Sequence, residues 1–179
     1  MTDAPASRRA FLAATTALSG SLLIGASPMS EASAKPERIV NRRKPAAAAG
    51  VLWLGGDFEV ARMGFGAMRI TGDGIWGEPR DQRDARAVLR RAVELGVNFI
   101  DTADAYGPDI SERLIKEALH PYERGLIIAT KGGMTRQGPN RWAPDCRPSH
   151  LRAACEASLI RLKLEAHPHH VLAAGRGGH

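Results

Sequence analysis

Three side chains in this sequence could together deliver a proton: Asp101, Tyr106 and Lys131. Asp101 and Lys131 each follow a short apolar run, at 97–100 and 126–129, and Tyr106 lies shortly after Asp101. A phenol ordinarily titrates near a pH of roughly 10, but a neighbouring ammonium stabilises its anion and a carboxylate holds the ammonium in place. Such a set can pass a proton to a carbonyl oxygen while a hydride reaches the carbon. Singly, the three have ordinary roles in turns, in packing and on the solvated surface.

Short apolar runs alternate with amphipathic segments from residue 51 onward, and these elements must position the three side chains. Residues 51–54 and 58–62 predict a β-hairpin over a Gly-Gly-Asp turn. Strands are expected at 63–69, 97–100 and 126–129, and helices at 81–95, 111–119 and 149–163. This alternation predicts right-handed crossovers and a parallel sheet. Because no G-x-G-x-x-G motif joins the first strand to the first helix, a (β/α) barrel is favoured over a dinucleotide-binding doubly wound sheet.

The helix ends carry capping signals. Asp81 or Asp84 is expected to accept from the first amides of the first helix, and Ser149 from those of the third. Gly96 stands where the first helix should end. In a barrel the chemistry lies at the carboxyl ends of the strands, so Asp101 and Lys131 are expected to meet there.

Several segments resemble the N-terminal half of the aldo-keto reductase family. Residues 54–60 resemble its opening hairpin and residues 63–68 its first strand. Residues 96–107, which read GVNFIDTADAYG from Gly96, resemble its second-strand signature, and the Ile-Ala-Thr-Lys of 128–131 its third-strand end. The resemblance covers 51–165 and implies an α/β fold: a partial (β/α)8 TIM barrel, with the first three β/α units after an N-terminal β-hairpin.

The resemblance also implies a function, the NADPH-dependent reduction of a small-molecule aldehyde or ketone. Tyr106 would be the proton donor, with Lys131 and Asp101 as the other catalytic residues. The family positions that lie against the nicotinamide and ribose of NADP(H) correspond to Gly66, Ala67, Met68 and Asp101. The Gly-rich stretch 71–79 and Trp142, in the long loop after Lys131, would line the substrate pocket.

The family pattern stops after Glu165, where a fourth strand ending in a catalytic histidine is expected. The sequence instead reads AHPHHVLAAGRGGH, in which Pro168 should break a strand and the histidine's position falls near Ala173. We therefore expect strands four to eight to be absent, the tail 166–179 to be divergent, and the chain to be truncated or frameshifted and inactive. The alternative to a reductase is a non-catalytic barrel fragment, inert or self-associating through open sheet edges. The tail histidines lack carboxylate partners, so no metal site is expected.

Residues 1–34 resemble a twin-arginine signal peptide. Arg8 and Arg9 precede an uncharged stretch, 10–30, and Ala32-Ser33-Ala34 then offers a cleavage site. We expect export to the periplasm and no stable membrane span after cleavage. Residues 35–50, with two prolines, a basic cluster and an alanine run, predict a solvated linker. The alternative is contact of this basic cluster with anionic lipid headgroups.

Composition excludes several other classes of protein. The chain has 179 residues with 44% hydrophobic and 25% charged residues, which is typical of a globular domain. Its net charge of +6 is uneven: residues 1–50 carry seven Lys/Arg and three Asp/Glu, and residues 51–179 carry eighteen and sixteen. Because the basicity lies mostly outside the predicted fold, nucleic acid is not expected as a partner.

Overall fold

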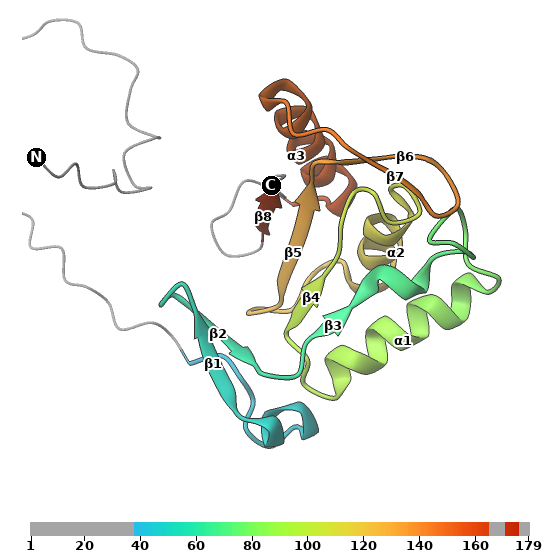
Figure 1. Ribbon diagram of the computed structural model, residues 1–179. Helices are drawn as coiled ribbons and strands as arrows, with labels where there is room; N and C mark the ends of the chain where they lie inside the picture. The colour runs from blue at the N-terminus through green and yellow to red at the C-terminus, as the bar shows by residue number, and fades with distance from the viewer. Residues whose placement is uncertain (1–37, 165–170, 176–179) are drawn as a thin grey trace, which may run out of the picture. The chain divides into compact units, whose positions relative to one another are not determined.

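The computed structural model describes residues 38–164 and, as backbone, residues 171–175. Its centre is a four-stranded parallel sheet with the strand order β3-β4-β5-β8 (Figure 1). These strands are β3 (Phe65–Gly66), β4 (Phe99–Asp101), β5 (Ile127–Gly132) and β8 (Val171–Gly175). Helix α1 lies between β3 and β4 in the chain and α2 between β4 and β5, as the alternation predicts, and α3 lies between β5 and β8. The predicted signal peptide and the rest of the tail lie outside the described residues.

The fourth parallel strand corrects the expectation that none follows Glu165. Strand β8 pairs with β5, and Ala173 lies opposite Thr130 and Ala174 opposite Lys131. Pro168 precedes this strand instead of standing inside it, so it removes no amide from the ladder. Pairing also gives hydrogen-bond partners to the edge of β5, which would otherwise be open. Within the described residues the sheet has edges at β3 and β8 and does not close into a barrel.

The first predicted strand, 63–69, is mostly not a strand. Only β3 is extended, and the chain then turns into the 3₁₀ helix η3 (Ala67–Ile70). Residues three apart lie on the same side of a 3₁₀ helix, and both Ala67 and Ile70 are buried in the core. The prediction of a seven-residue strand was wrong because two apolar residues three apart bury better in a 3₁₀ turn than on alternate faces of a strand.

In the described part of the chain, three α-helices cover the sheet: α1 (Gln82–Glu94), α2 (Ile110–Leu119) and α3 (Pro148–Leu162). The carboxylate of Asp81 accepts from the amides of Arg83 at 2.7 Å and Asp84 at 3.1 Å, which confirms the predicted cap. Gly96 follows α1 at a φ of +96°, a conformation that glycine adopts readily. The predicted Ser149 cap is wrong. Helix α3 begins at Pro148 without a side-chain capping bond, and proline suits a first turn that needs no amide there.

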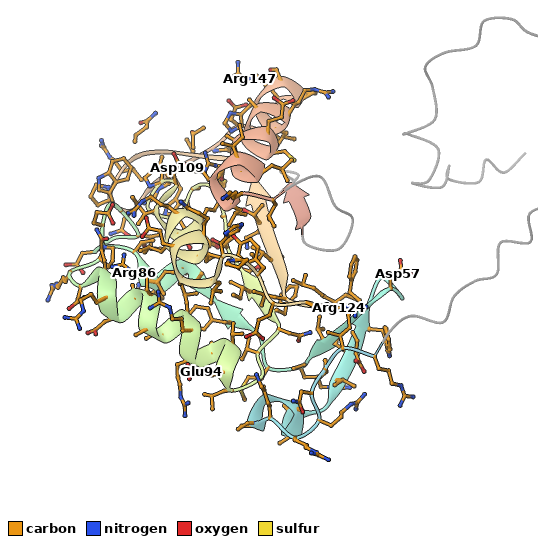
Figure 2. All side chains as sticks on the ribbon, turned by 180° about the vertical axis from the view of Figure 1, so that it is seen from behind. Asp57, Arg86, Glu94, Asp109, Arg124 and Arg147 are labelled. Carbon is orange, nitrogen blue, oxygen red and sulfur yellow. The ribbon has the colours of Figure 1, made fainter. Side chains whose placement is uncertain are left out.

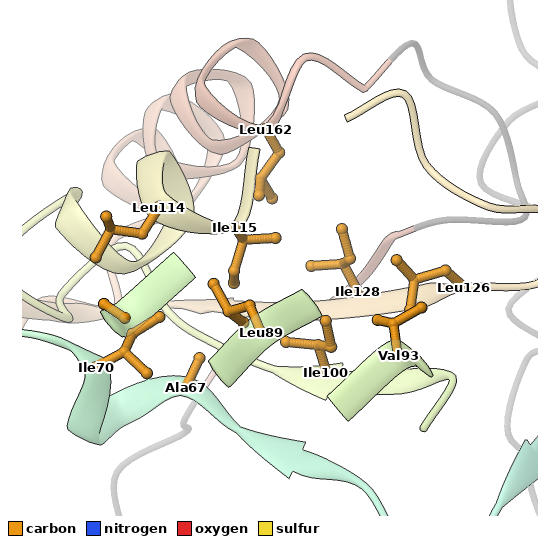
Figure 3. Packing of buried hydrophobic residues seen from close by; sticks show 11 residues of the cluster. Ala67, Ile70, Leu89, Val93, Ile100, Leu114, Ile115, Leu126, Ile128 and Leu162 are labelled. Atoms are coloured by element: carbon orange, nitrogen blue, oxygen red, sulfur yellow. The ribbon is translucent and has the colours of Figure 1, made fainter. Parts of the chain in front are cut away.

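The core lies between the helices and the sheet (Figure 3). Its fully buried side chains include Leu89 of α1, Ile100 of β4, Leu114 and Ile115 of α2, Ile128 of β5 and Leu162 of α3. The helical members of this set are among the apolar positions whose spacing predicted the helices, and Ile100 and Ile128 lie in predicted strands. The three helices and two central strands therefore contribute to one cluster, which fixes the helices against the sheet.

A second, antiparallel pair of strands lies at the start of the parallel strands. The hairpin of β1 (Val51–Leu54) and β2 (Phe58–Ala61) confirms the prediction for this segment. Asn98, which precedes β4, accepts from the amide of Ala61 at 2.9 Å and donates to the carbonyl of Glu59 at 2.9 Å. The hairpin thus packs at the amino ends of the strands, away from their carboxyl ends (Figure 1).

Residues 38–50 do not form the solvated spacer that their composition predicts. They contain the 3₁₀ helix η2 (Pro45–Ala49), and Val40 and Ala46 are buried in a second cluster with residues of β2 and α1. The carboxylate of Glu59, buried in β2, accepts from the amides of Ile39 and Val40 at 2.6 and 2.9 Å. The segment contains a cluster of basic residues, but its apolar residues Val40 and Ala46 bind it to the fold.

No helix among the described residues is both long enough and apolar enough to cross a bilayer. Charged side chains lie along the helices instead, among them Arg86 and Glu94 on α1 (Figure 2). Arg86 pairs with Glu117 of α2 at 3.0 Å and so links two neighbouring helices.

Candidate active site

Asp101 and Lys131 meet at the carboxyl ends of two neighbouring strands, as predicted. Asp101 is the last residue of β4 and pairs in register with Ala129 of β5. Lys131 lies two residues beyond Ala129, so its side chain points to the same face of the sheet. The ammonium Nζ lies 2.6 Å from Oδ1 of Asp101, a short charge-assisted hydrogen bond. Both side chains are partly exposed, so a ligand could reach them.

Tyr106 completes the predicted set from the loop after β4. The Nζ atom of Lys131 lies 5.4 Å from the centre of the Tyr106 ring, within the range of a cation–π contact. Backbone hydrogen bonds hold this loop against the end of β5. The amide of Asp104 donates to the carbonyl of Lys131 at 3.2 Å. The amide of Ser111, in the first turn of α2, donates to the carbonyl of Tyr106 at 3.0 Å. The structure therefore brings all three predicted catalytic side chains together.

The predicted cofactor positions divide into accessible and buried residues. Gly66 pairs with Asp101 in the sheet and is exposed, and a Cβ added to it would meet no atom within 4 Å. Met68 is 36% exposed. The side chain of Ala67 is fully buried in the core, and its carbonyl accepts from Ser111 Oγ at 3.3 Å. Gly66 and Met68 thus offer free surface beside Asp101, whereas the side chain of Ala67 does not reach that surface.

The long loop predicted after Lys131 contains a hairpin that the sequence analysis missed. Strands β6 (Met134–Gly138) and β7 (Arg141–Pro144) pair antiparallel, with an irregularity between Arg136 and Gly138. Trp142 of β7 packs edge-on against Tyr106 with ring centres 6.3 Å apart. The Gly-rich stretch also reaches this face, because Trp76 forms a parallel bridge with Gly107. Both predicted pocket segments therefore border Tyr106.

A group of buried charged side chains lies next to the Tyr106 loop, and no pattern in the sequence predicts it. Glu112 of α2 is fully buried and accepts from Thr130 Oγ1 at 2.5 Å and from Arg161 Nε at 2.6 Å. Asp104 lies nearby, and its buried Oδ1 has no hydrogen-bond partner among the described residues. Burial first, and the Glu112 carboxylate second, raise the pKa of Asp104 to about 6. A glutamate on a helix is ordinarily exposed, so the burial of Glu112 could not be predicted without knowing that Arg161 and Thr130 pair with it.

Among residues 38–164 there is no cluster of three or more His, Cys, Asp or Glu side chains that could hold a metal ion. The tail histidines, on which the sequence analysis based its expectation of no metal site, lie outside the described residues.

A parallel α/β sheet with polar side chains at its strand ends has the architecture of one sector of a (β/α) barrel enzyme. The model of the aldo/keto reductase family matches residues 62–168, and the chain belongs to this family. It is 60% identical over 107 residues to an uncharacterized oxidoreductase of Schizosaccharomyces pombe, covering 60% of this chain and 35% of that protein. It is 44% identical over 110 residues to pyridoxine 4-dehydrogenase of Escherichia coli, covering 62% and 38%.

Solved structures show the same relation. The chain superposes on an aldo-keto reductase from Bacillus halodurans, in its holo form, with a TM-score of 0.54 and 32% identity, covering 64% of this chain and 36% of that one. The glycerol dehydrogenase of Gluconobacter oxydans gives a TM-score of 0.55 and 32% identity, covering 66% and 37%. The chain spans just over a third of the length of the curated relatives it matches.

Proposed function

We propose that this chain supplies the proton-donating part of an NADPH-dependent aldo-keto reductase that reduces a small aldehyde or ketone. The observation that carries the proposal is the contact of Lys131 with both the Asp101 carboxylate, at 2.6 Å, and the Tyr106 ring, at 5.4 Å from its centre. Membership of the family supports it independently.

Each side chain has a separate task in this proposal. Tyr106 donates its phenolic proton to the carbonyl oxygen of the substrate. The Lys131 ammonium stabilises the phenolate that remains, since an opposite charge nearby favours the charged form. Asp101 fixes the ammonium by accepting from it, so the lysine stays directed at the ring.

The accessible residues fit a nicotinamide cofactor. NADPH, when bound, supplies the hydride that reaches the carbonyl carbon. The open surface of Gly66 allows a flat ring to approach the backbone, which a side chain at this position would obstruct. Met68 offers apolar contact and the Asp101 carboxylate can accept from a ribose hydroxyl. These three residues would hold the end of the cofactor that reacts.

Binding of NADPH to the full chain tests this proposal. Saturable quenching of protein fluorescence is expected on titration with NADPH. The Tyr106→Phe variant should bind NADPH equally well but lose at least about 10²-fold in carbonyl turnover, because only the proton donor is removed. Lys116→Met replaces a partly buried lysine of α2 that is not among the predicted site residues, and as a control it should leave both properties unchanged. A flat titration of the wild-type chain would contradict the proposal.

A second candidate is a non-catalytic barrel fragment that is inert or self-associating. The observation favouring it is that Ala173 and Ala174 stand opposite Thr130 and Lys131, where the family resemblance places a catalytic histidine. The sheet is also open at both edges among the described residues. Under this candidate the chain gives neither turnover nor a saturable cofactor response.

We also propose that the chain is exported by the twin-arginine route. The paired Arg8 and Arg9 before an uncharged stretch support this proposal. Replacing both arginines by lysine keeps the charge and should abolish export, so the chain should remain in the cytoplasmic fraction at its full length. Export of the double variant at the wild-type level would contradict it.

A further inference from the structure

Arg136, in the β6–β7 hairpin, uses every hydrogen-bond donor that it has. A guanidinium carries five N–H donors, and here each donates to a backbone carbonyl. The Nε atom donates to Arg141 at 3.2 Å, Nη1 to Ile75 and Ala105 at 2.8 Å each, and Nη2 to Gly74 at 3.0 Å and Gly138 at 3.3 Å. With no donor left, this guanidinium cannot bind the carboxylate or phosphate of a ligand by hydrogen bonds.

These carbonyls come from three separate segments of the chain. Two lie in the Gly-rich loop before α1, one in the loop after β4, and two in the hairpin itself. Ala105 is the residue directly before Tyr106, so the bond to its carbonyl fixes the backbone that carries the phenol. The amide of Asn140 also donates to Gly74, at 3.0 Å, which ties the hairpin to the Gly-rich loop a second time.

The flat faces of the same guanidinium contact two tryptophans. Its central carbon lies 3.6 Å from the centre of the Trp142 ring and 5.7 Å from that of Trp76. Trp142 packs in turn against the edge of Tyr106. Arg136 therefore acts on Tyr106 through two routes, the carbonyl before it and the ring beside it, without touching the phenol.

We infer that Arg136 is a positioning residue for the proton donor: by its bond to Ala105 and its stacking on Trp142 it holds Tyr106 where Lys131 can reach it. The inference rests on the proposed function, because it assigns Tyr106 its role. Lysine could not replace Arg136 in this role. A lysine has three donors on a single nitrogen and lacks the planar guanidinium that reaches three segments.

Hydrogen exchange of the full chain tests the positioning without relying on activity. The variants are Arg136→Gln and Arg136→Lys, and the control is Arg141→Gln, which removes an exposed arginine from the same hairpin. Both Arg136 variants should exchange about tenfold faster in peptides covering 72–78 and 102–108, because these loops lose their common anchor. Peptides from α1 should stay unchanged, and Arg141→Gln should match the wild type.

Kinetics then separate positioning from general stability. Where the wild-type chain turns over a carbonyl substrate, both Arg136 variants should lower kcat about tenfold to a hundredfold, with the dissociation constant of NADPH unchanged, because a displaced proton donor affects only the reacting geometry. Wild-type activity in Arg136→Lys would overturn the inference, because charge alone would then suffice. Faster exchange over the whole chain would also overturn it, by showing a structural role only. A wild-type chain that binds no NADPH contradicts the proposed function, and the exchange pattern still decides whether Arg136 holds the loop.

Discussion

At the scale of single residues, a group of buried charged side chains lies next to the candidate active site. Glu112 is completely buried, but its two carboxylate oxygens accept from Thr130 and Arg161. Arg161 also pairs with Asp109 at 3.3 Å. Asp104 is the exception in this group, since its Oδ1 is buried without a partner among the described residues. A carboxylate in that position is costly when ionised.

The raised pKa of Asp104 predicts a specific dependence of stability on pH. Its pKa rises from 3.8 to about 6 on folding, so the folded state keeps a proton that the unfolded state releases between these values. The free energy of unfolding should therefore fall as pH rises through this window. Asp104→Asn cannot ionise, so it should become more stable than the wild type between pH 4 and 7 by about 1 kcal/mol, allowing for partial solvent screening.

Urea denaturation of both proteins across that pH range measures this difference. Asp57→Asn, at the exposed turn of the β1–β2 hairpin, is the matched control and should follow the wild-type pH dependence. Taking the difference between variant and wild type removes the contribution of groups such as Glu117, whose arginine partners lower its pKa and so act in the opposite direction. A constant difference across the range would show that Asp104 does not titrate there.

The site residues that could be predicted from the sequence are those that lie at the carboxyl ends of strands. Asp101 and Lys131 end neighbouring strands, and parallel strands bring their carboxyl ends to one edge. Arg136 could not be predicted, because its partners are backbone carbonyls up to 62 residues away in the chain and any residue type supplies a carbonyl. Glu112 and Asp104 were missed for a related reason, since their burial depends on packing between α2 and α3.

At the scale of elements, the helices, the β1–β2 hairpin and strands β4 and β5 were predictable, whereas the end of β3 and the β6–β7 hairpin were not. The apolar spacing of α1 and α2 reports one buried face each, and Leu89 of α1 and Leu114 and Ile115 of α2 lie in the core. Strand β3 has only two residues, so no alternation could show where it ends. The β6–β7 hairpin did carry a turn signal in Gly138-Pro139-Asn140, and Asn140 adopts a positive φ of 56° there. Its strands are mostly polar, with β6 half-buried and β7 mostly exposed, so hydropathy did not reveal them.

Residues 38–50 show how composition can mislead about an element. A cluster of Arg and Lys suggested a solvated linker, but the buried carboxylate of Glu59 needs donors, and this segment supplies them. Arg42 lies 2.7 Å from Glu59 and remains half exposed. Together these contacts lower the pKa of Glu59 against the opposing effect of its burial, which is the largest single influence. The basic residues therefore partly serve the fold.

At the scale of the whole molecule, the open sheet determines what the described residues can do alone. Strand β8 covers one side of β5 but presents its own outer edge, and β3 presents another. Unpaired strand edges favour pairing with a second chain. The same sheet that positions Asp101 and Lys131 therefore favours the self-association that the sequence analysis named as an alternative.

Proline substitutions in β8 separate its two edges. Neighbouring amides of a strand point to opposite sides, so in Leu172→Pro and Ala173→Pro one proline removes an amide directed at β5 and the other an amide directed outward. The inward proline should lower the free energy of unfolding by about 1–3 kcal/mol, because a carbonyl of β5 loses its partner. The outward one should cost little and should weaken concentration-dependent association. Urea denaturation and sedimentation velocity at several concentrations measure both effects on the full chain. Equal stability and equal association of the two variants would show that β8 does not pair with β5 in solution. The edge of β5 beside Lys131 would then be exposed to solvent.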